Sequence, residues 1–315
     1  MKAIKNILFT CCLYLTVLVL FTACSDWNVP EPVDIGTNNA EEQNPELWER
    51  YMQKLHAYKQ SKHFLTYARF DNGMDKPVNE GGYLRSLPDS LDIVTLGNAD
   101  NITDFDREDI PRLQEKSTRV LYLVDYAAKM AALNDITKLG AYLDKAVATA
   151  TELNLDGFAF TGIPLYSGTE AEFAAHKERI RLIVSKLSAA AGSGKLLVLE
   201  GDPALVEAAD VEKLNYVVIN TADVGNVTEV KLMIAGMLAY SSLSKDKYLL
   251  SARIGSEIAD ENNVKKSSVS LMLDFVASMG PLGGLAIYSI GDDYYSAKMN
   301  YETTRAVIQQ MNPSK

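Results

Sequence analysis

A short stretch near the middle of the chain begins like a cluster of acidic residues and does not continue as one. Residues 153–164 read LNLDGFAFTGIP, so Asp156 is followed by Ala159, Thr161 and Ile163, three alternate positions that share one face of a strand. Acids at these positions would gather carboxyl groups able to donate and accept protons. The spacing is present here, but the carboxyl groups after Asp156 are missing.

Eight short apolar or β-branched segments recur along the chain, and each ends in polar residues or glycine. Amphipathic segments with an apolar residue every three or four positions lie between several of them, and another precedes the first, at 47–62, 135–154, 171–191 and 226–243. Apolar strands alternating with helices indicate parallel strands buried on both faces. The strand segments are 63–70, 91–98, 118–126, 155–162, 195–202, 214–222, 247–255 and 283–293.

This alternation predicts an α/β fold, a compact (β/α)8 TIM barrel over residues 47–315. The alternative is an open doubly wound sheet, which commonly carries a glycine-rich phosphate loop after its first strand. The patterns GxGxxG and GxxxxGKS/T do not occur in the sequence, and their absence favours the barrel. In a barrel, ligand-binding side chains lie at the carboxyl ends of the strands and in the loops that follow them.

The N-terminus predicts a secretory segment that is removed. Lys2 and Lys5 precede an apolar run of about 15 residues, and the run ends at Ala23 and Cys24. This pattern resembles a bacterial lipoprotein signal peptide over residues 1–23, in which Cys24 becomes the lipidated first residue. The alternative, a transmembrane anchor, needs about 20 apolar residues and is not favoured.

Residues 24–46 are rich in proline, asparagine and acidic residues, which predicts a flexible tether between the lipid and the domain. The alternative is an edge segment that docks on the domain through Trp27 and Val29. Without residues 1–23 the chain has 29 basic and 41 acidic residues, a net charge of about −12. Because it lacks basic clusters, we expect no binding to nucleic acid or to anionic lipid headgroups.

The cysteines and histidines do not indicate a metal or redox site. Cys11 and Cys12 lie in the predicted signal peptide, so the mature chain keeps only Cys24 and cannot form an internal disulfide. The three histidines, His56, His63 and His176, are scattered and form no HExxH pattern. We therefore expect no bound metal and no cofactor.

The fourth strand segment carries a resemblance to a known family. The helix before it, its LDG start and the order of the strands resemble family 18 glycoside hydrolases, the chitinase-like and endo-β-N-acetylglucosaminidase-like barrels. In that family the fourth strand carries the motif DGxDxDxE. Its first Asp and its Gly fall on Asp156 and Gly157, its other two Asp fall on Ala159 and Thr161, and its Glu falls on Ile163. The resemblance therefore comes with a degenerate catalytic motif.

These departures from the motif affect the groups that perform catalysis in the family. In active members the sugar's own acetamide attacks the anomeric carbon, the Glu protonates the leaving oxygen, and the neighbouring Asp stabilises the acetamide. Losing general acid catalysis alone costs about 10²- to 10⁴-fold in rate. Asn220 and Ala222 stand where the family commonly places a Gln or Met and then a Tyr against the acetamide, and Tyr288 stands where it often has a Trp. The resemblance predicts a catalytically inactive barrel.

The combined signals resemble the surface lipoproteins of Bacteroidetes-type polysaccharide or host-glycan utilisation systems. This resemblance implies that the protein binds GlcNAc-containing glycans, is anchored to the outer membrane by its lipid and works beside an outer-membrane glycan transporter. It implies exposure at the cell surface, with the periplasmic face as the alternative.

Candidate ligand-binding residues are the polar and aromatic side chains at the predicted strand ends. Sugars are held by aromatic faces and by planar polar side chains that bond hydroxyls. The candidates are Tyr67, Arg69, Asn98, Asp125, Tyr126, Thr161, Glu200, Asp202, Asn220, Arg253, Tyr288, Asp292, Asp293, Tyr294 and Tyr295.

Each candidate also has a structural interpretation. The tyrosines could pack between barrel and helices, and Arg69 and Arg253 could pair with neighbouring acids inside the mouth. Asp156 could bond the backbone at the strand end, and the SIGDDYY stretch could be a solvated turn that caps a helix.

Two other functions remain open from the sequence. One is an active glycoside hydrolase with a relocated acid, in which Glu200 works with Asp125 or Asp202 at a suitable separation. The other is a structural lipoprotein without a sugar ligand, which predicts a barrel mouth plugged by its own side chains.

Overall fold

The structure, a computed structural model, describes residues 40–240 and 242–313. The predicted signal peptide, Cys24 and most of the predicted tether lie outside the described residues. In the rest of the predicted tether, helix α2 spans Ala40–Gln43 and helix α3 begins at Pro45 and ends at Gln60. None of the helices in the described ranges is both long and apolar enough to cross a membrane.

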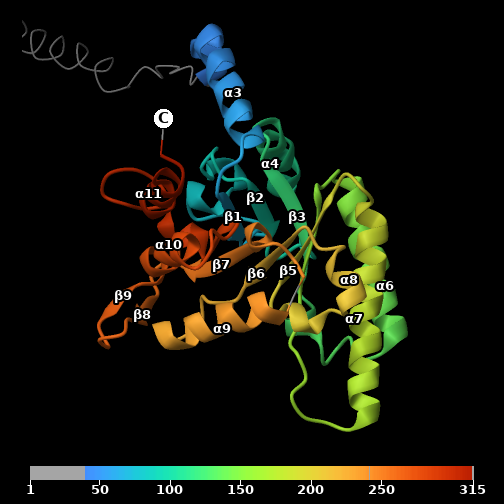
Figure 1. Ribbon diagram of the computed structural model, residues 1–315. Coiled ribbons are helices and arrows are strands. Elements are labelled where there is room, and N and C mark those ends of the chain that lie inside the picture. Colours follow the sequence, from blue (N-terminus) through green and yellow to red (C-terminus); the bar gives the residue numbers. More distant parts are fainter. Residues whose placement is uncertain (1–39, 241, 314–315) are drawn as a thin grey trace, which may run out of the picture. The chain divides into compact units, whose positions relative to one another are not determined.

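Eight parallel strands close into a barrel, which confirms the predicted fold (Figure 1). Their order around the barrel is β1, β10, β7, β6, β5, β4, β3 and β2, so the first and last strands pair with each other. Each strand lies within one of the predicted segments. The strands are β1 (Leu65–Phe70), β2 (Ile93–Leu96), β3 (Arg119–Val124), β4 (Gly157–Thr161), β5 (Leu196–Glu200), β6 (Tyr216–Ile219), β7 (Tyr248–Arg253) and β10 (Gly284–Tyr288).

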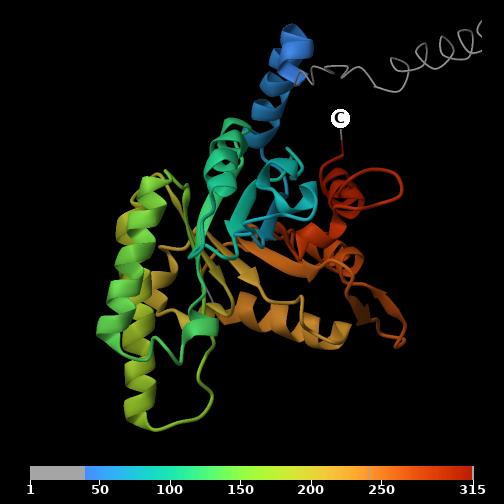
Figure 2. The same cartoon turned by 180° about the vertical axis from the view of Figure 1, so that it is seen from behind.

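Helices surround the barrel, and α6 and α7 pack side by side on its outside (Figure 1). Seen from behind, the red C-terminal helix lies beside the first strands, where Asn312 accepts a hydrogen bond from the backbone N–H of Phe64 (Figure 2). The antiparallel hairpin β8 (Glu257–Ala259) and β9 (Lys265–Ser267) was not predicted, because its short strands are charged and largely exposed. The helices are α4 (Asp104–Glu115), α5 (Tyr126–Lys129), α6 (Ile136–Glu152), α7 (Glu170–Ala191), α8 (Ala208–Val211), α9 (Val227–Tyr240), α10 (Ser268–Ser278) and α11 (Glu302–Met311).

The strands separate two layers of buried side chains. One set packs between strands and helices, and the other fills the barrel interior. Because side chains alternate along a strand, register partners on neighbouring strands point to the same side. Thr161 pairs with Glu200, Arg69 with Thr95, and Tyr288 with Arg253. The register therefore brings these polar residues together at the carboxyl ends of the strands.

Asp156 and Gly157 lie at the amino end of β4, where both have a structural role. The Asp156 carboxylate accepts hydrogen bonds from the backbone N–H of Val120 at 2.9 Å and from the Gln114 amide at 2.9 Å. Gly157 has φ = 144°, and a Cβ there would lie 2.0 Å from the carbonyl oxygen of Leu196. Asp156 thus accepts a hydrogen bond from the backbone, which was its structural interpretation from the sequence. Gly157 allows β5 to lie close to the start of β4.

A buried ionic cluster joins the end of α3 to the amino ends of the strands. The Asp92 carboxylate accepts hydrogen bonds from His63 at 2.9 Å and from the backbone N–H of Thr66 at 2.8 Å, and it lies 3.9 Å from the Lys59 ammonium. The hydrogen bond to Asp92 raises the pKa of His63 although burial acts against it. Burial lowers the pKa of Lys59 to about 8.

We predict that the coupling between His63 and Asp92 weakens as the pH rises. A raised folded-state pKa stabilises the fold fully below the unfolded value of about 6.5, and this contribution is lost as the pH rises through the folded value. A double-mutant cycle with His63→Gln and Asp92→Asn, measured by urea unfolding, should give a coupling of about 1 kcal/mol at pH 5.5 and less at pH 7.5. This window lies below the pKa of Lys59. A coupling that grows with pH would contradict the assignment.

Candidate functional site

A cavity of about 520 Å³ opens at the carboxyl ends of the strands. Its volume falls within the range of roughly 300–1,000 Å³ that is usual for small-molecule sites. Seven predicted residues line it, which are Arg69, Asp125, Thr161, Glu200, Asn220, Arg253 and Tyr288. The other lining residues are Asp71, Ala127, Ala128, Gly162, Ile163, Gly201, Asp223 and Ser289.

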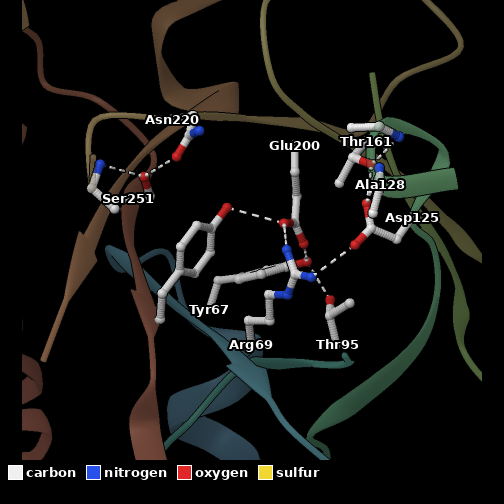
Figure 3. Close-up of polar contacts among 12 residues, drawn as sticks. Tyr67, Arg69, Thr95, Asp125, Ala128, Thr161, Glu200, Asn220 and Ser251 are labelled. Carbon is white, nitrogen blue, oxygen red and sulfur yellow. Dashed lines mark hydrogen bonds and ion pairs between the residues drawn. The ribbon is translucent and has the colours of Figure 1, made fainter. Parts of the chain in front are cut away.

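Arg69, from β1, links two carboxylates at the centre of the cavity (Figure 3). Its Nη2 lies 3.2 Å from Oδ2 of Asp125, and its Nη1 lies 3.5 Å from Oε2 of Glu200. The Glu200 side chain is only 3% exposed, whereas those of Arg69 and Asp125 are about one quarter exposed. Arg69 therefore neutralises a buried carboxylate while keeping one edge toward the cavity.

Both carboxylate oxygens of Glu200 already accept hydrogen bonds. Tyr67 donates to Oε1 at 2.5 Å and Tyr288 donates to Oε2 at 3.0 Å, while Thr95 donates to the Tyr67 hydroxyl. Burial raises the pKa of Glu200 even though Arg69 and the two tyrosines favour its charged form. Burial also holds the pKa of both tyrosines well above the usual value, so they remain donors. Glu200 is thus enclosed by groups of its own chain.

Asp125 is held as an ion by a second set of donors. Its Oδ1 accepts hydrogen bonds from the Thr161 hydroxyl at 2.7 Å and from the backbone N–H of Ala128 at 3.3 Å. Burial would raise its pKa, but these hydrogen bonds and Arg69 together lower it. Thr161 also accepts from the backbone N–H of Ala127. Thr161, at the motif's third Asp position, is therefore a neutral partner of Asp125.

The opposite wall of the cavity is built around Arg253 from β7. Its Nη2 lies 2.8 Å from Oδ1 of Asp223, and its Nη1 donates to the Ser289 hydroxyl at 3.3 Å. The guanidinium groups of Arg253 and Arg69 each lie 5.9 Å from the centre of the Tyr288 ring. Asn220 accepts a hydrogen bond from Ser251 at 3.4 Å. This wall offers planar polar groups, and the Tyr288 ring is buried.

The alternate positions after Asp156 extend from the barrel interior to the cavity. Ala159 is fully buried inside the barrel, and Thr161 follows it in the cavity wall. Ile163 lines the cavity with 49% of its surface exposed. The three positions thus run from the interior to the mouth, and none of them carries a carboxyl group.

Of the five predicted tyrosines, four do not line this cavity, and the structure gives them other contacts. Tyr67 is fully buried and donates to Glu200, and Tyr295 is largely exposed. Tyr126 is fully buried and accepts a hydrogen bond from Arg179 of α7, because the chain leaves β3 at Val124 and Tyr126 is the first residue of helix α5. The Tyr294 ring packs edge-to-face against Tyr295 and Tyr301.

Three predicted polar residues are likewise engaged in backbone structure rather than in the cavity. Asn98 bonds the carbonyl of Asn72 at 2.8 Å, and Asp202 accepts from the backbone N–H of Ala204 at 2.8 Å. Asp293 is buried and accepts from the backbone N–H of Thr304 at 2.7 Å, which holds the start of α11. Asp292 lines a smaller neighbouring cavity.

Sequence reasoning missed three polar lining residues, Asp71, Asp223 and Ser289. Asp71 and Ser289 directly follow β1 and β10, and Asp223 lies in the loop after β6. Their position after a strand end was a usable signal. Among the described residues, no group of three or more His, Cys, Asp and Glu side chains is arranged to hold a metal ion.

Comparisons with known proteins agree with this architecture. Residues 28–138 match the family model described as glycoside hydrolase family 18, BT1044-like. A solved structure of a selenomethionine variant of BT1044 is 18% identical, with a TM-score of 0.68, and covers 88% of this chain and 96% of its own. A search of curated proteins found no match for this chain.

Two further structures share the fold. The endo-β-N-acetylglucosaminidase from Cordyceps militaris, solved as a mutant in complex with fucosyl-N-acetylglucosamine-Asn, is 19% identical, with a TM-score of 0.63, over 83% of this chain and 95% of its own. YKL-39, solved in the presence of GlcNAc4 chitooligosaccharides, is 10% identical, with a TM-score of 0.60, over 80% of this chain and all of its own. The described chain therefore has the barrel fold of these glycoside hydrolase structures, and its residues 28–138 match the BT1044-like model of family 18.

Proposed function

We propose that this protein binds a GlcNAc-containing glycan in the barrel mouth without cleaving it. The proposal rests on one observation: the cavity is open, and the positions of the family's acids carry side chains without a carboxyl group. Ala159, Thr161 and Ile163 occupy the positions of the family's acids, and Ile163 lines the cavity where the Glu would stand. The binding space is present without the proton donor that substrate-assisted cleavage requires.

The ligand class is supported by what is known of the relatives. The Cordyceps militaris enzyme was solved with fucosyl-N-acetylglucosamine-Asn, and YKL-39 with GlcNAc4. In the present cavity, Arg69, Asn220 and Arg253 offer planar polar groups that suit sugar hydroxyl and acetamide groups. The cavity thus has the size and the polar surface that such a ligand needs.

One observation favours the rival function of an active hydrolase. Glu200 lies in the cavity wall, and burial raises its pKa, as expected for a general acid. Its two oxygens, however, accept hydrogen bonds from Tyr67 and Tyr288, and Arg69 lies beside it. A general acid must reach the leaving oxygen of the substrate. Glu200 is better explained as the buried counter-ion of Arg69.

The structural lipoprotein without a sugar ligand is less well supported, because it predicts a plugged mouth and the cavity is open. We also propose that Cys24 carries a lipid, that the protein is attached to the outer membrane at the cell surface, and that it works beside a glycan transporter. The basis is the signal-like sequence that ends at Ala23 and the acidic, proline-containing stretch after it.

We predict binding without product release when a chain beginning at Ser25 is tested against N-glycans, chitin oligomers and mucin glycans. Calorimetry should detect a ligand, and chromatography should recover it intact. Arg253→Met should weaken binding about tenfold, because it removes a charged donor from the cavity wall. Arg181→Met is the matched control, since Arg181 lies on α7 away from the cavity and forms a surface ion pair with Glu207. Cleaved product from the unaltered chain would contradict the proposal.

A second prediction distinguishes a structural role of Glu200, as the counter-ion of Arg69, from a catalytic role as a general acid. Glu200→Gln leaves Arg69 without its buried counter-charge and places an amide among donors, so it should lower the free energy of unfolding by about 2 kcal/mol. Asp223→Asn removes the partner of Arg253 from a far more exposed pair and should cost well under 1 kcal/mol. Urea unfolding measures both. A Glu200→Gln chain that keeps its stability and loses a measurable hydrolysis would instead identify an active enzyme.

A further inference from the structure

The amino ends of the eight strands form the end of the barrel opposite the mouth. Because the strands are parallel, residues that precede or begin a strand lie at this one end wherever they stand in the sequence. Six of them are basic, and we call them the amino-end basic group. They are Lys62 before β1, Arg119 at the start of β3, Lys195 before β5, Lys213 before β6, and Lys245 and Lys247 before β7.

Electrostatic effects on two neighbouring groups show that several of these side chains lie close together. A hydrogen bond within its turn lowers the pKa of the exposed Asp246, and Lys62 and Lys247 lower it further. Burial raises the pKa of Tyr216 at the start of β6, whereas Arg119 acts to lower it and Asp246 acts in the same direction as burial. Side chains from before β1, β3 and β7 therefore gather around the floor of the barrel.

The charges at this end are only partly balanced. Lys213 pairs with Asp210 at 2.7 Å, but the other five basic residues form no ion pair within residues 40–240 and 242–313. Three exposed acids at the same end, Glu115, Glu212 and Asp246, form none there either. The net charge of these unpaired groups is about +2, whereas the predicted mature chain carries about −12.

The sequence does not predict this group, because it contains no run of basic residues and we therefore expect no binding to anionic headgroups from it. Single basic residues before separate strands are brought to one end only when the barrel closes. The structure thus gives an acidic protein one face of opposite sign.

A cavity of about 460 Å³ opens at the same end, beside the end of α7 and the starts of β5 and β6. Lys195, Lys213, Ser188 and Asn215 are among its lining residues. The Asn215 side-chain oxygen accepts from the backbone N–H of Leu197 at 2.7 Å, so its amide N–H groups can donate to a ligand. The carboxyl end of α7 contributes about half a negative charge, which is less than the charge of Lys195. The cavity can therefore accept a phosphate group.

We propose that the amino-end basic group docks on an anionic membrane surface, with a headgroup phosphate in the cavity beside Lys195. The inference goes beyond glycan binding, and it uses the proposed lipid at Cys24 only to bring the domain near a membrane. The chain enters the barrel at the amino end of β1, so an N-terminal anchor leads to this same end. Docking would turn the mouth away from the membrane, toward the side from which a glycan arrives.

Co-sedimentation with vesicles tests the docking without the lipid. A chain beginning at Ser25 is used at about 0.1 M salt, where a Debye length of about 10 Å screens the acidic residues far from the contact. Vesicles of phosphatidylglycerol and phosphatidylcholine should bind about tenfold more chain than phosphatidylcholine alone. Lys195→Gln with Lys247→Gln should remove most of this difference. Lys265→Gln with Lys266→Gln is the matched control, because these exposed residues lie on hairpin strand β9 after the carboxyl end of β7.

Lysine acetylation tests the orientation of an anchored chain. In a chain beginning at Cys24 that residue is the only cysteine, so it can be coupled to a maleimide lipid. Mass spectrometry then compares acetylation on anionic and neutral vesicles. Lys195 and Lys247 should react about threefold more slowly on the anionic vesicles, and Lys265 and Lys266 should react equally on both.

The outcomes separate this docking from glycan binding. Equal sedimentation with both kinds of vesicle, or an equal loss in the hairpin control, would overturn the docking and leave glycan binding intact. Calorimetric binding of inorganic phosphate without binding to vesicles would overturn it in favour of a soluble phosphate ligand. Vesicle binding by a chain that binds no glycan would support the docking and overturn the proposed function. Lys195→Gln with Lys247→Gln should leave glycan affinity unchanged, because neither residue lines the mouth.

Discussion

The ionic contact of Arg69 with Asp125 and Glu200 is the constraint on which the mouth of the barrel depends. A carboxylate as buried as Glu200 is costly unless charges and donors surround it. Arg69, Tyr67 and Tyr288 meet that requirement, and their side chains come from the paired strands β1 and β10. The pairing of β1 with β10, which closes the barrel, therefore also positions the groups that balance the charge of Glu200.

The two ends of β4 have different surroundings. Asp156 and Gly157 lie at the amino end of β4, where they bond the backbone of β3 and allow β5 to approach. The altered positions lie at the other end, inside the barrel and at the cavity. The residues that form the start of the strand are therefore separate from those that face the cavity. Thr161 belongs to the second group and donates a hydrogen bond to Asp125.

The sequence predicts the strands well, because a parallel strand buried on both faces is a short apolar run whatever its neighbours are. Alternation from the motif also predicted that Ala159, Thr161 and Ile163 share a face. The environment of Tyr126 did not follow from the strand pattern, because β3 ends at Val124 and Tyr126 begins helix α5, where its hydroxyl accepts a hydrogen bond from Arg179 of α7. The turn at Ser289 and the close packing of Gly81 on Tyr294 could not be predicted, since they depend on the backbone of the loops after β1 and β10.

The central claim is that the mouth binds a glycan and leaves it whole, and a crystal structure of the chain grown with GlcNAc4 tests it most directly. The account predicts one intact tetrasaccharide with one unit between Arg69 and Arg253, while Glu200 keeps its hydrogen bonds to Tyr67 and Tyr288. Shortened products in the cavity, with the Glu200 carboxyl turned toward a glycosidic oxygen, would contradict it.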